Sequence, residues 1–159
     1  MGLLSTILSL FGCGTEKSSN SQPNNSYKLV ADKITIQELP KELEKLQKGK
    51  TEYDFTGITS NGTDCIYFMK DGTNFQIDFE AMGEDQLKYI EKLKEFSVSK
   101  GYKFEMTTYG NKPEYNSLTN APVIQIKTNS DLKTTAEIGK IIQESIFHNN
   151  IDTIYEVVP

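Results

Sequence analysis

The stretch Asp64-Cys-Ile-Tyr-Phe-Met-Lys-Asp-Gly-Thr-Asn-Phe-Gln-Ile-Asp-Phe-Glu80 has the pattern of a β-hairpin, and the other predicted elements are arranged around it. Its second half alternates, with Phe75, Ile77 and Phe79 on one side and polar residues between them. This two-residue period is typical of a strand with one buried and one solvated face. Its first half, from Cys65 to Met69, is apolar on both faces, as in an inner strand. Asp71-Gly72 joins the halves, because both residues tolerate positive φ in a tight turn.

Further strands and helices are predicted on both sides of the hairpin. The expected strands are 28–31 (a short edge strand), 52–59, 102–106 and 123–128, and the expected helices are 36–48, 84–99 and one beginning near 130–134. Ser130-Asp131 or Thr134 is predicted to cap the last helix, and Thr134-Thr135-Ala136-Glu137 matches a capping box. The apolar run 151–158 is expected to be a strand at the sheet edge or a segment lying on a neighbour.

These elements predict a two-layer α+β domain over residues 27–159. Its sheet would be antiparallel with five strands, or six if the C-terminal segment joins it, and the helices would pack mainly on one face. The element order is α-βββ-α-ββ-α with the C-terminal strand-like segment added. Over residues 36–149 this order resembles the type III secretion chaperone-like fold. The resemblance implies a small acidic protein that binds secreted effector proteins.

Composition excludes one class of partner. The chain has 159 residues and a net charge of −5, and its 17 basic residues are all lysines. Arginine is the preferred residue for bidentate contacts to phosphate and guanine. Its absence, together with lysines interleaved among acids, argues against nucleic-acid binding. The abundance of lysine, asparagine and isoleucine indicates a bacterial source.

The N-terminal segment has three interpretations. Residues 2–12 are apolar, too few to span a bilayer, and end at Cys13. Leu10-Phe11-Gly12-Cys13 resembles a bacterial lipobox, which predicts lipid attachment at Cys13, although no positive charge precedes it. Alternatively, residues 1–13 form an amphipathic helix on a cytoplasmic protein, or Gly2 is myristoylated. Residues 14–26 are polar and predict a disordered tether, as in membrane-anchored lipoproteins of the periplasm or cell surface.

No catalytic residue, metal ligand or cofactor is predicted. Cys65 falls in an inner strand and is expected to pack as a small hydrophobic residue. His148 is the only histidine and lies at a helix end without a recognisable partner. Asp78 and Glu80 share one face of a strand, but alternating acids are ordinary on a solvated face.

The tyrosines suggest a protein-binding surface. The chain has eight tyrosines and no tryptophan, and the predicted core does not account for all of them, Tyr53 and Tyr67 among these. Tyrosine suits interfaces because it combines a rigid apolar ring with a polar tip. Tyr109, Tyr115 and Leu118 are predicted to lie near one another at one end of the sheet and to contact a partner.

The first functional hypothesis is a non-enzymatic bacterial protein-binding domain. It would be tethered to a membrane through Cys13 and would neutralise or escort a secreted or toxic protein, as immunity proteins and chaperones do. The alternatives are a cytoplasmic adaptor of the secretion-chaperone type and an enzyme whose site has no recognisable motif. The identity of the partner and the oligomeric state do not follow from the sequence.

Lipid attachment at Cys13 predicts a change of compartment on substitution. Cys13→Ser should move the protein from the membrane fraction to the soluble fraction, because the thiol that would carry the lipid is lost. Fractionation followed by mass spectrometry of the N-terminus measures this. Unchanged membrane association of the variant would contradict the lipoprotein interpretation.

Overall fold

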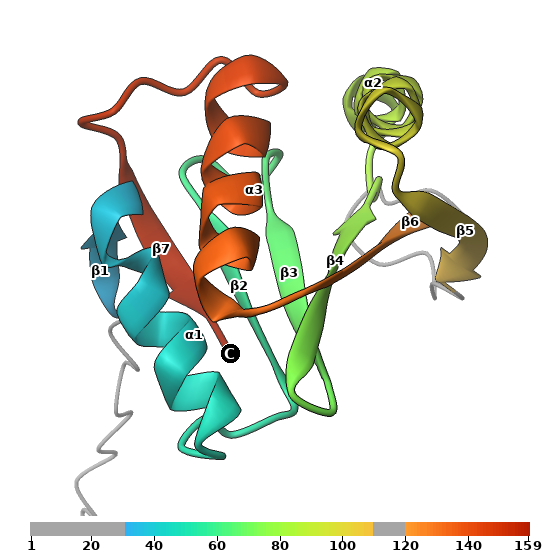
Figure 1. Cartoon of the computed structure of the whole chain (residues 1–159). Coiled ribbons are helices and arrows are strands. Elements are labelled where there is room, and N and C mark those ends of the chain that lie inside the picture. Colours follow the sequence, from blue (N-terminus) through green and yellow to red (C-terminus); the bar gives the residue numbers. More distant parts are fainter. Residues whose placement is uncertain (1–30, 110–119) are drawn as a thin grey trace, which may run out of the picture.

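The predicted hairpin lies at the centre of the sheet. A computed structural model describes residues 31–109 and 120–159, including all of the hairpin (Figure 1). β3 (Ile66–Asp71) and β4 (Asn74–Glu80) pair antiparallel, with Asp71 opposite Asn74. Gly72 takes a φ of +63° in the turn between them, a conformation that side chains other than glycine's rarely adopt. The two strands of the quoted stretch are therefore confirmed, but the turn comes one residue later than predicted: Gly72 and Thr73 join the strands, and Asp71 is the last residue of β3.

The described residues form seven strands and three α-helices. The remaining strands are β1 (Lys33–Thr35), β2 (Phe55–Thr59), β5 (Lys103–Tyr109), β6 (Ala121–Ser130) and β7 (Ile154–Val158). The helices are α1 (Leu39–Gln47), α2 (Leu87–Lys100) and α3 (Leu132–Ser145), and short 3-10 turns at Ile36–Glu38 and Glu84–Gln86 lead into α1 and α2. All strand pairs are antiparallel, and the order across the sheet is β1-β7-β2-β3-β4-β6-β5. The predicted α+β class is confirmed.

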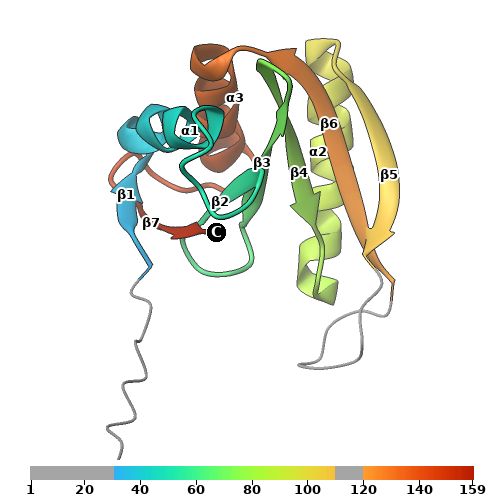
Figure 2. The same cartoon turned by 90° about the horizontal axis from the view of Figure 1, so that it is seen from below.

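The three α-helices cover one face of the sheet. In Figures 1 and 2, α1 and α3 lie together beside the central strands, and α2 lies along β6 and β5. Phe68 of β3 packs against α3, because a Cβ on Gly139 would lie only 2.8 Å from its ring. Phe79 of β4 meets Tyr89 of α2 edge-on, with 6.2 Å between the ring centroids. This face is the helix-covered face, and the opposite one is called the open face below.

The core lies between the helices and this face. Phe75, Ile77 and Phe79 are each 1% exposed, which confirms the predicted register of β4. Opposite them on β3, Ile66 and Phe68 are fully buried. Fully burying a large apolar side chain stabilises the fold by about 1.5–3 kcal/mol. A one-residue slip of the hairpin would turn these side chains to the open face, and most of this stabilisation would be lost.

Several predicted details are wrong. The sheet has seven strands, not five or six, because β1 precedes α1 and β7 joins the sheet. β7 is an inner strand between β1 and β2, not an edge strand, since its backbone groups pair on both sides. The short first strand runs from Lys33 to Thr35, later than the predicted 28–31, most of which lies outside the described residues. Of the alternative caps predicted for α3, Asp131 is confirmed, since it accepts a hydrogen bond from the Thr134 backbone N–H at 2.8 Å, and Thr134 is not the N-cap.

A buried carboxylate ties the β2–β3 turn to the end of α3. Asp64 is 2% exposed and accepts hydrogen bonds from the Thr59 hydroxyl at 2.6 Å, from the Ser60 N–H at 2.9 Å and from the Asn149 amide at 2.6 Å. The Gln143 amide donates to the Asp64 backbone carbonyl at 3.0 Å. Burial raises the pKa of the Asp64 carboxyl, but the bonds from Ser60, Thr59 and Asn149 together outweigh it and hold the pKa below its usual value.

The helices are all short in comparison with a bilayer. Within 31–109 and 120–159, none is long and apolar enough to cross a membrane.

The close contact between α3 and the sheet predicts that adding one methyl group, in Gly139→Ala, lowers the free energy of unfolding. A Cβ at Gly139 would come within 2.8 Å of Phe68 Cζ and 3.1 Å of Leu39 Cδ2, so Gly139→Ala must displace either these side chains or α3. Overpacking costs about 1–3 kcal/mol, against about 1 kcal/mol gained from helix propensity. Because the added Cβ would overlap two side chains, we expect an overpacking cost of about 2–3 kcal/mol, in the upper part of this range, and a net loss of about 1–2 kcal/mol in urea unfolding. Glu137→Ala on the exposed side of α3 is the control and should change stability by less than about 0.5 kcal/mol. Equal stability of Gly139→Ala and the wild type would contradict the close approach.

Candidate functional site

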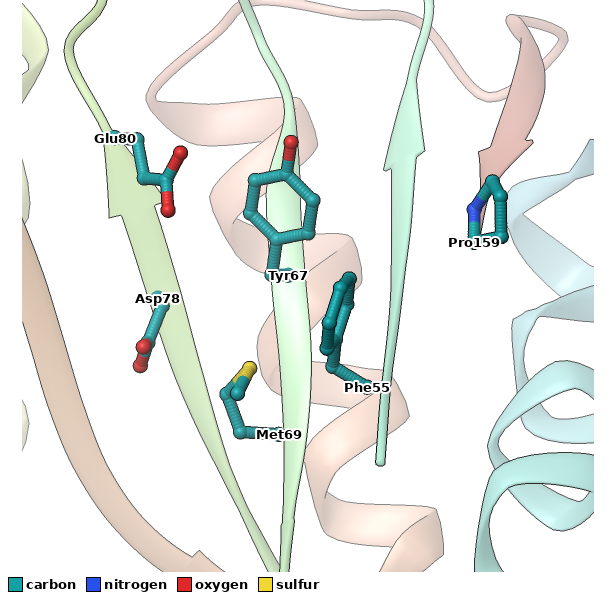
Figure 3. A pocket seen from close by; sticks show the side chains of 6 residues that line it. All are labelled: Phe55, Tyr67, Met69, Asp78, Glu80 and Pro159. Carbon is teal, nitrogen blue, oxygen red and sulfur yellow. The ribbon is translucent and has the colours of Figure 1, made fainter. Parts of the chain in front are cut away.

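The open face carries a hollow at the middle of the sheet. Six residues line it: Phe55, Tyr67, Met69, Asp78, Glu80 and Pro159. Its volume is about 390 Å³. Figure 3 shows the side chains of β4, β3 and β2 projecting on the side of the sheet that faces away from α3. We refer to this site as the central hollow.

Strand register places the central hollow. Gly57 of β2 lies opposite Tyr67 of β3, Tyr67 opposite Asp78 of β4, and Asp78 opposite Gln125 of β6. These four residues form one row across the open face. Because side chains alternate along a strand, burying Phe68 and Ile77 on the helix-covered face directs Tyr67 and Asp78 to the opposite one.

A missing side chain makes room in this row. The Tyr67 ring leans over Gly57, where a Cβ would lie 2.9 Å from Tyr67 Cδ1. This approach is closer than side chains allow, so only glycine fits beneath the ring. By leaning toward β2, Tyr67 leaves space on the side of β4, where Asp78 and Glu80 lie (Figure 3).

Aromatic rings form one wall of the site. Tyr53 stacks on Phe55 with ring centroids 5.3 Å apart and an interplanar angle of 11°. Phe55 in turn meets Tyr67 edge-on at 5.9 Å. Tyr53 is 49% exposed, so the strip of three rings runs from the central hollow to the surface. Such a strip offers rigid apolar contact area at low cost in side-chain entropy.

Asp78 is a buried carboxyl with an unused acceptor. It is 7% exposed, and its Oδ2 accepts a hydrogen bond from the Gln125 amide at 3.1 Å. Its Oδ1 is buried without a hydrogen-bond partner. Burial raises the pKa of Asp78 to about 6, and the Gln125 bond and the charge of Lys127 only partly offset this. A buried carboxylate with one acceptor unsatisfied is energetically costly.

Glu80 and Cys65 extend the polar side of the hollow. Burial, and then the neighbouring charge of Asp78, raise the pKa of the Glu80 carboxyl. Cys65 is half-buried and is not among the core residues, contrary to the prediction that it packs in the core. Burial raises the pKa of its thiol to about 11, although a hydrogen bond with Tyr67 lowers it somewhat, so the thiol stays protonated at neutral pH.

The nearest lysine is committed to other groups. Lys127 Nζ donates to Gln76 Oε1 at 3.0 Å and lies 3.3 Å from Glu105 Oε2. It influences Asp78 through its charge, but no bond joins it to Oδ1. The site therefore presents two carboxyls, one of them with an open acceptor, beside aromatic rings. This combination suits a positively charged group.

The structure does not describe most of the residues that the sequence analysis selected. Cys13, Tyr115 and Leu118 are outside the described residues, and so is the side chain of Tyr109, which ends β5 opposite Ala121. Their grouping and the lipid at Cys13 stay predictions. His148 is exposed at a φ of 62°, just after α3. Within 31–109 and 120–159, no group of three or more His, Cys, Asp or Glu could hold a metal ion.

Asp78 and Glu80 were noted in the sequence as an ordinary solvated pair, and this interpretation missed the site. Two signals pointed to it. Gly57 interrupts a strand, which often marks a close approach of another group. Tyr67 lies on the face of β3 that the predicted core did not use.

Comparisons with protein-family models, with curated proteins and with solved structures found no match. The resemblance to the type III secretion chaperone-like fold therefore stays a prediction.

Asp78 predicts an unusual dependence of stability on pH. Its folded pKa of about 6 lies above the ordinary value of 3.8, so the folded state binds this proton more tightly than the unfolded state. The free energy of unfolding should fall as the pH rises from the unfolded pKa of 3.8 through the folded pKa of about 6. The ionised Asp78 carboxylate should therefore destabilise the folded state at pH 7.5. Asp78→Asn should therefore stabilise the protein at pH 7.5, by about 1–3 kcal/mol, and by much less near pH 4.

Asp64→Asn provides the control of opposite sign. Its carboxylate is satisfied by several donors and its pKa is lowered, so the amide should destabilise at pH 7.5. Urea unfolding at the two pH values measures both variants. If the wild type is more stable than Asp78→Asn at pH 7.5, the raised pKa of Asp78 is contradicted.

Proposed function

We propose that the protein is a non-enzymatic protein-binding domain that docks a basic partner on the open face of its sheet. One observation carries the proposal: the central hollow contains the buried Asp78 carboxyl with its Oδ1 unpartnered. A second protein that brings a donor to this atom would satisfy it and relieve its cost. The net charge of −5 favours approach of a basic protein over an acidic one.

The aromatic strip supports a protein as the partner. Tyr53, Phe55 and Tyr67 present stacked and edge-on rings beside Met69. Tyrosine and methionine are enriched at protein interfaces, and central aromatic residues commonly supply most of the binding energy. A flat sheet face with such a strip offers a partner both apolar area and a polar anchor.

The place of action is a separate part of the proposal. With a lipid on Cys13 and residues 14–26 as a tether, the domain would stand at a bacterial membrane surface. There it would neutralise or escort a secreted or toxic protein, in the manner of an immunity protein or a chaperone. The alternative is a cytoplasmic adaptor that keeps its N-terminus and binds its partner in the same way.

The proposal predicts which variants lose the partner. A partner is first captured from the source cells on the immobilised domain and identified, and its dissociation constant is then measured by calorimetry. Tyr53→Ser and Asp78→Asn should each weaken binding by about 2 kcal/mol, or about thirtyfold, if their side chains are central to the interface. The melting temperature of Tyr53→Ser should change little, because this tyrosine is half-exposed.

Two comparisons make the result decisive. Thr107→Ala, an exposed position on β5, is the matched control and should bind normally. Tyr115→Ala tests the predicted loop surface. Loss of binding in Tyr115→Ala with normal binding in Tyr53→Ser and Asp78→Asn would place the interface on the loop and reject the open face.

A further inference from the structure

We propose that the central hollow receives the charged tip of one lysine or arginine side chain from the partner protein. The ammonium or guanidinium would lie between the Asp78 and Glu80 carboxyls, with its stem against Tyr67 and Phe55. This inference rests on the proposed function and deepens it, because it names the group that the site recognises.

The first argument is the count of donors and acceptors. Asp78 Oδ2 already has the Gln125 amide as a partner, but Oδ1 has none, although its residue is only 7% exposed. Buried acceptors are nearly always satisfied in folded proteins. Because Asp78 lines the hollow, a donor from a second molecule can approach its carboxyl group, and a charged donor forms the strongest such bond.

The second argument is the charge balance of the strands around Asp78. Glu80 lies two residues along the same strand, and Tyr67 faces Asp78 from β3. From β6, Gln125 is neutral and Lys127 is already bonded to Gln76 and paired with Glu105. Cys65, next to Tyr67 on the same face, keeps its proton. The hollow therefore holds two acidic groups whose charge the neighbouring side chains leave largely uncompensated.

The third argument is shape. A volume of about 390 Å³ accommodates one long side chain, and its walls suit both parts of a basic one. The methylene stem would contact Met69, Tyr67 and Phe55, while the cation would lie between the two carboxyls.

Protonation should control this contact. A cation in the hollow stabilises the ionised carboxyls, so it lowers the pKa of Asp78 from its value of about 6 and releases a proton when binding occurs near or below that pH. Binding should consequently be strongest above pH 7 and should weaken as the pH falls toward 4.5. Glu80, the other acid of the hollow, has a raised pKa and acts in the same direction.

The test uses small probes of known charge. The isotope-labelled full chain is titrated by NMR with n-butylammonium and n-propylguanidinium, and with n-propylurea as the neutral counterpart of the latter. At pH 7.5, the cations should shift the signals of Tyr67, Asp78 and Glu80 with dissociation constants in the millimolar range, as for fragments. Binding should be at least tenfold weaker at pH 4.5 and in Asp78→Asn. Asp71→Asn, which removes an exposed acid from the hairpin turn, should bind as the wild type does.

Two outcomes would overturn the proposal. The proposal is overturned if neither cation shifts the signals of these residues at a concentration of about 50 mM. It is also overturned if n-propylurea binds as tightly as n-propylguanidinium. If the captured partner still needs Asp78 in that case, the proposed function stands without a basic side chain in the hollow. If the cations bind through Asp78 but Asp78→Asn captures the partner normally, the partner does not use the hollow, and the protein source of the cation is rejected.

Discussion

The contact between Phe68 and the backbone of α3 at Gly139 determines which residues reach solvent. Phe68 lies at the centre of the core, and the helix approaches it so closely that a Cβ on the glycine would overlap the ring. Because Phe68 faces the helices, the two-residue period of β3 directs its neighbours Tyr67 and Met69 to the open face. The pairing of β3 with β4 extends this constraint to Asp78. Packing on one side of the sheet thus determines which residues line the central hollow on the other.

Two buried aspartates differ in how many hydrogen-bond donors surround them. Asp64 is surrounded by hydroxyl, amide and backbone donors, and its pKa is lowered. Asp78 has one amide donor and a raised pKa. Both are almost fully buried, so burial alone does not distinguish them. The number of donors does, because hydrogen bonds to the ionised form are what offset its desolvation. The first aspartate holds a turn against a helix, and the second is left with capacity for another molecule.

Local signals in the sequence were sufficient for most elements. Alternation defined β4, Asp71-Gly72 defined its turn, and Gly101 marked the end of α2, where it takes a φ of 73°. Features that depend on distant residues were not predictable in this way. The place of β7 depends on strands that precede it by many residues, and nothing within Ile154–Val158 indicates its two neighbours. Asp78 is buried partly through Gln125, which is 47 positions away, so its own strand shows only an ordinary acid among apolar neighbours.

The interior position of β7 affects how the protein is made. Strands β2 to β6 leave the ribosome in an order in which β2–β3, β3–β4 and β5–β6 can pair at once. The outer side of β2 has no partner until β7, the last described strand, emerges, and β1 waits for the same event after more than a hundred residues of synthesis. Closing so long a loop is slow, and an unpaired strand edge attracts other chains in the meantime. The outer side of β2 therefore stays unpaired until synthesis is nearly complete, and any copy that stops short of β7 would present that edge permanently.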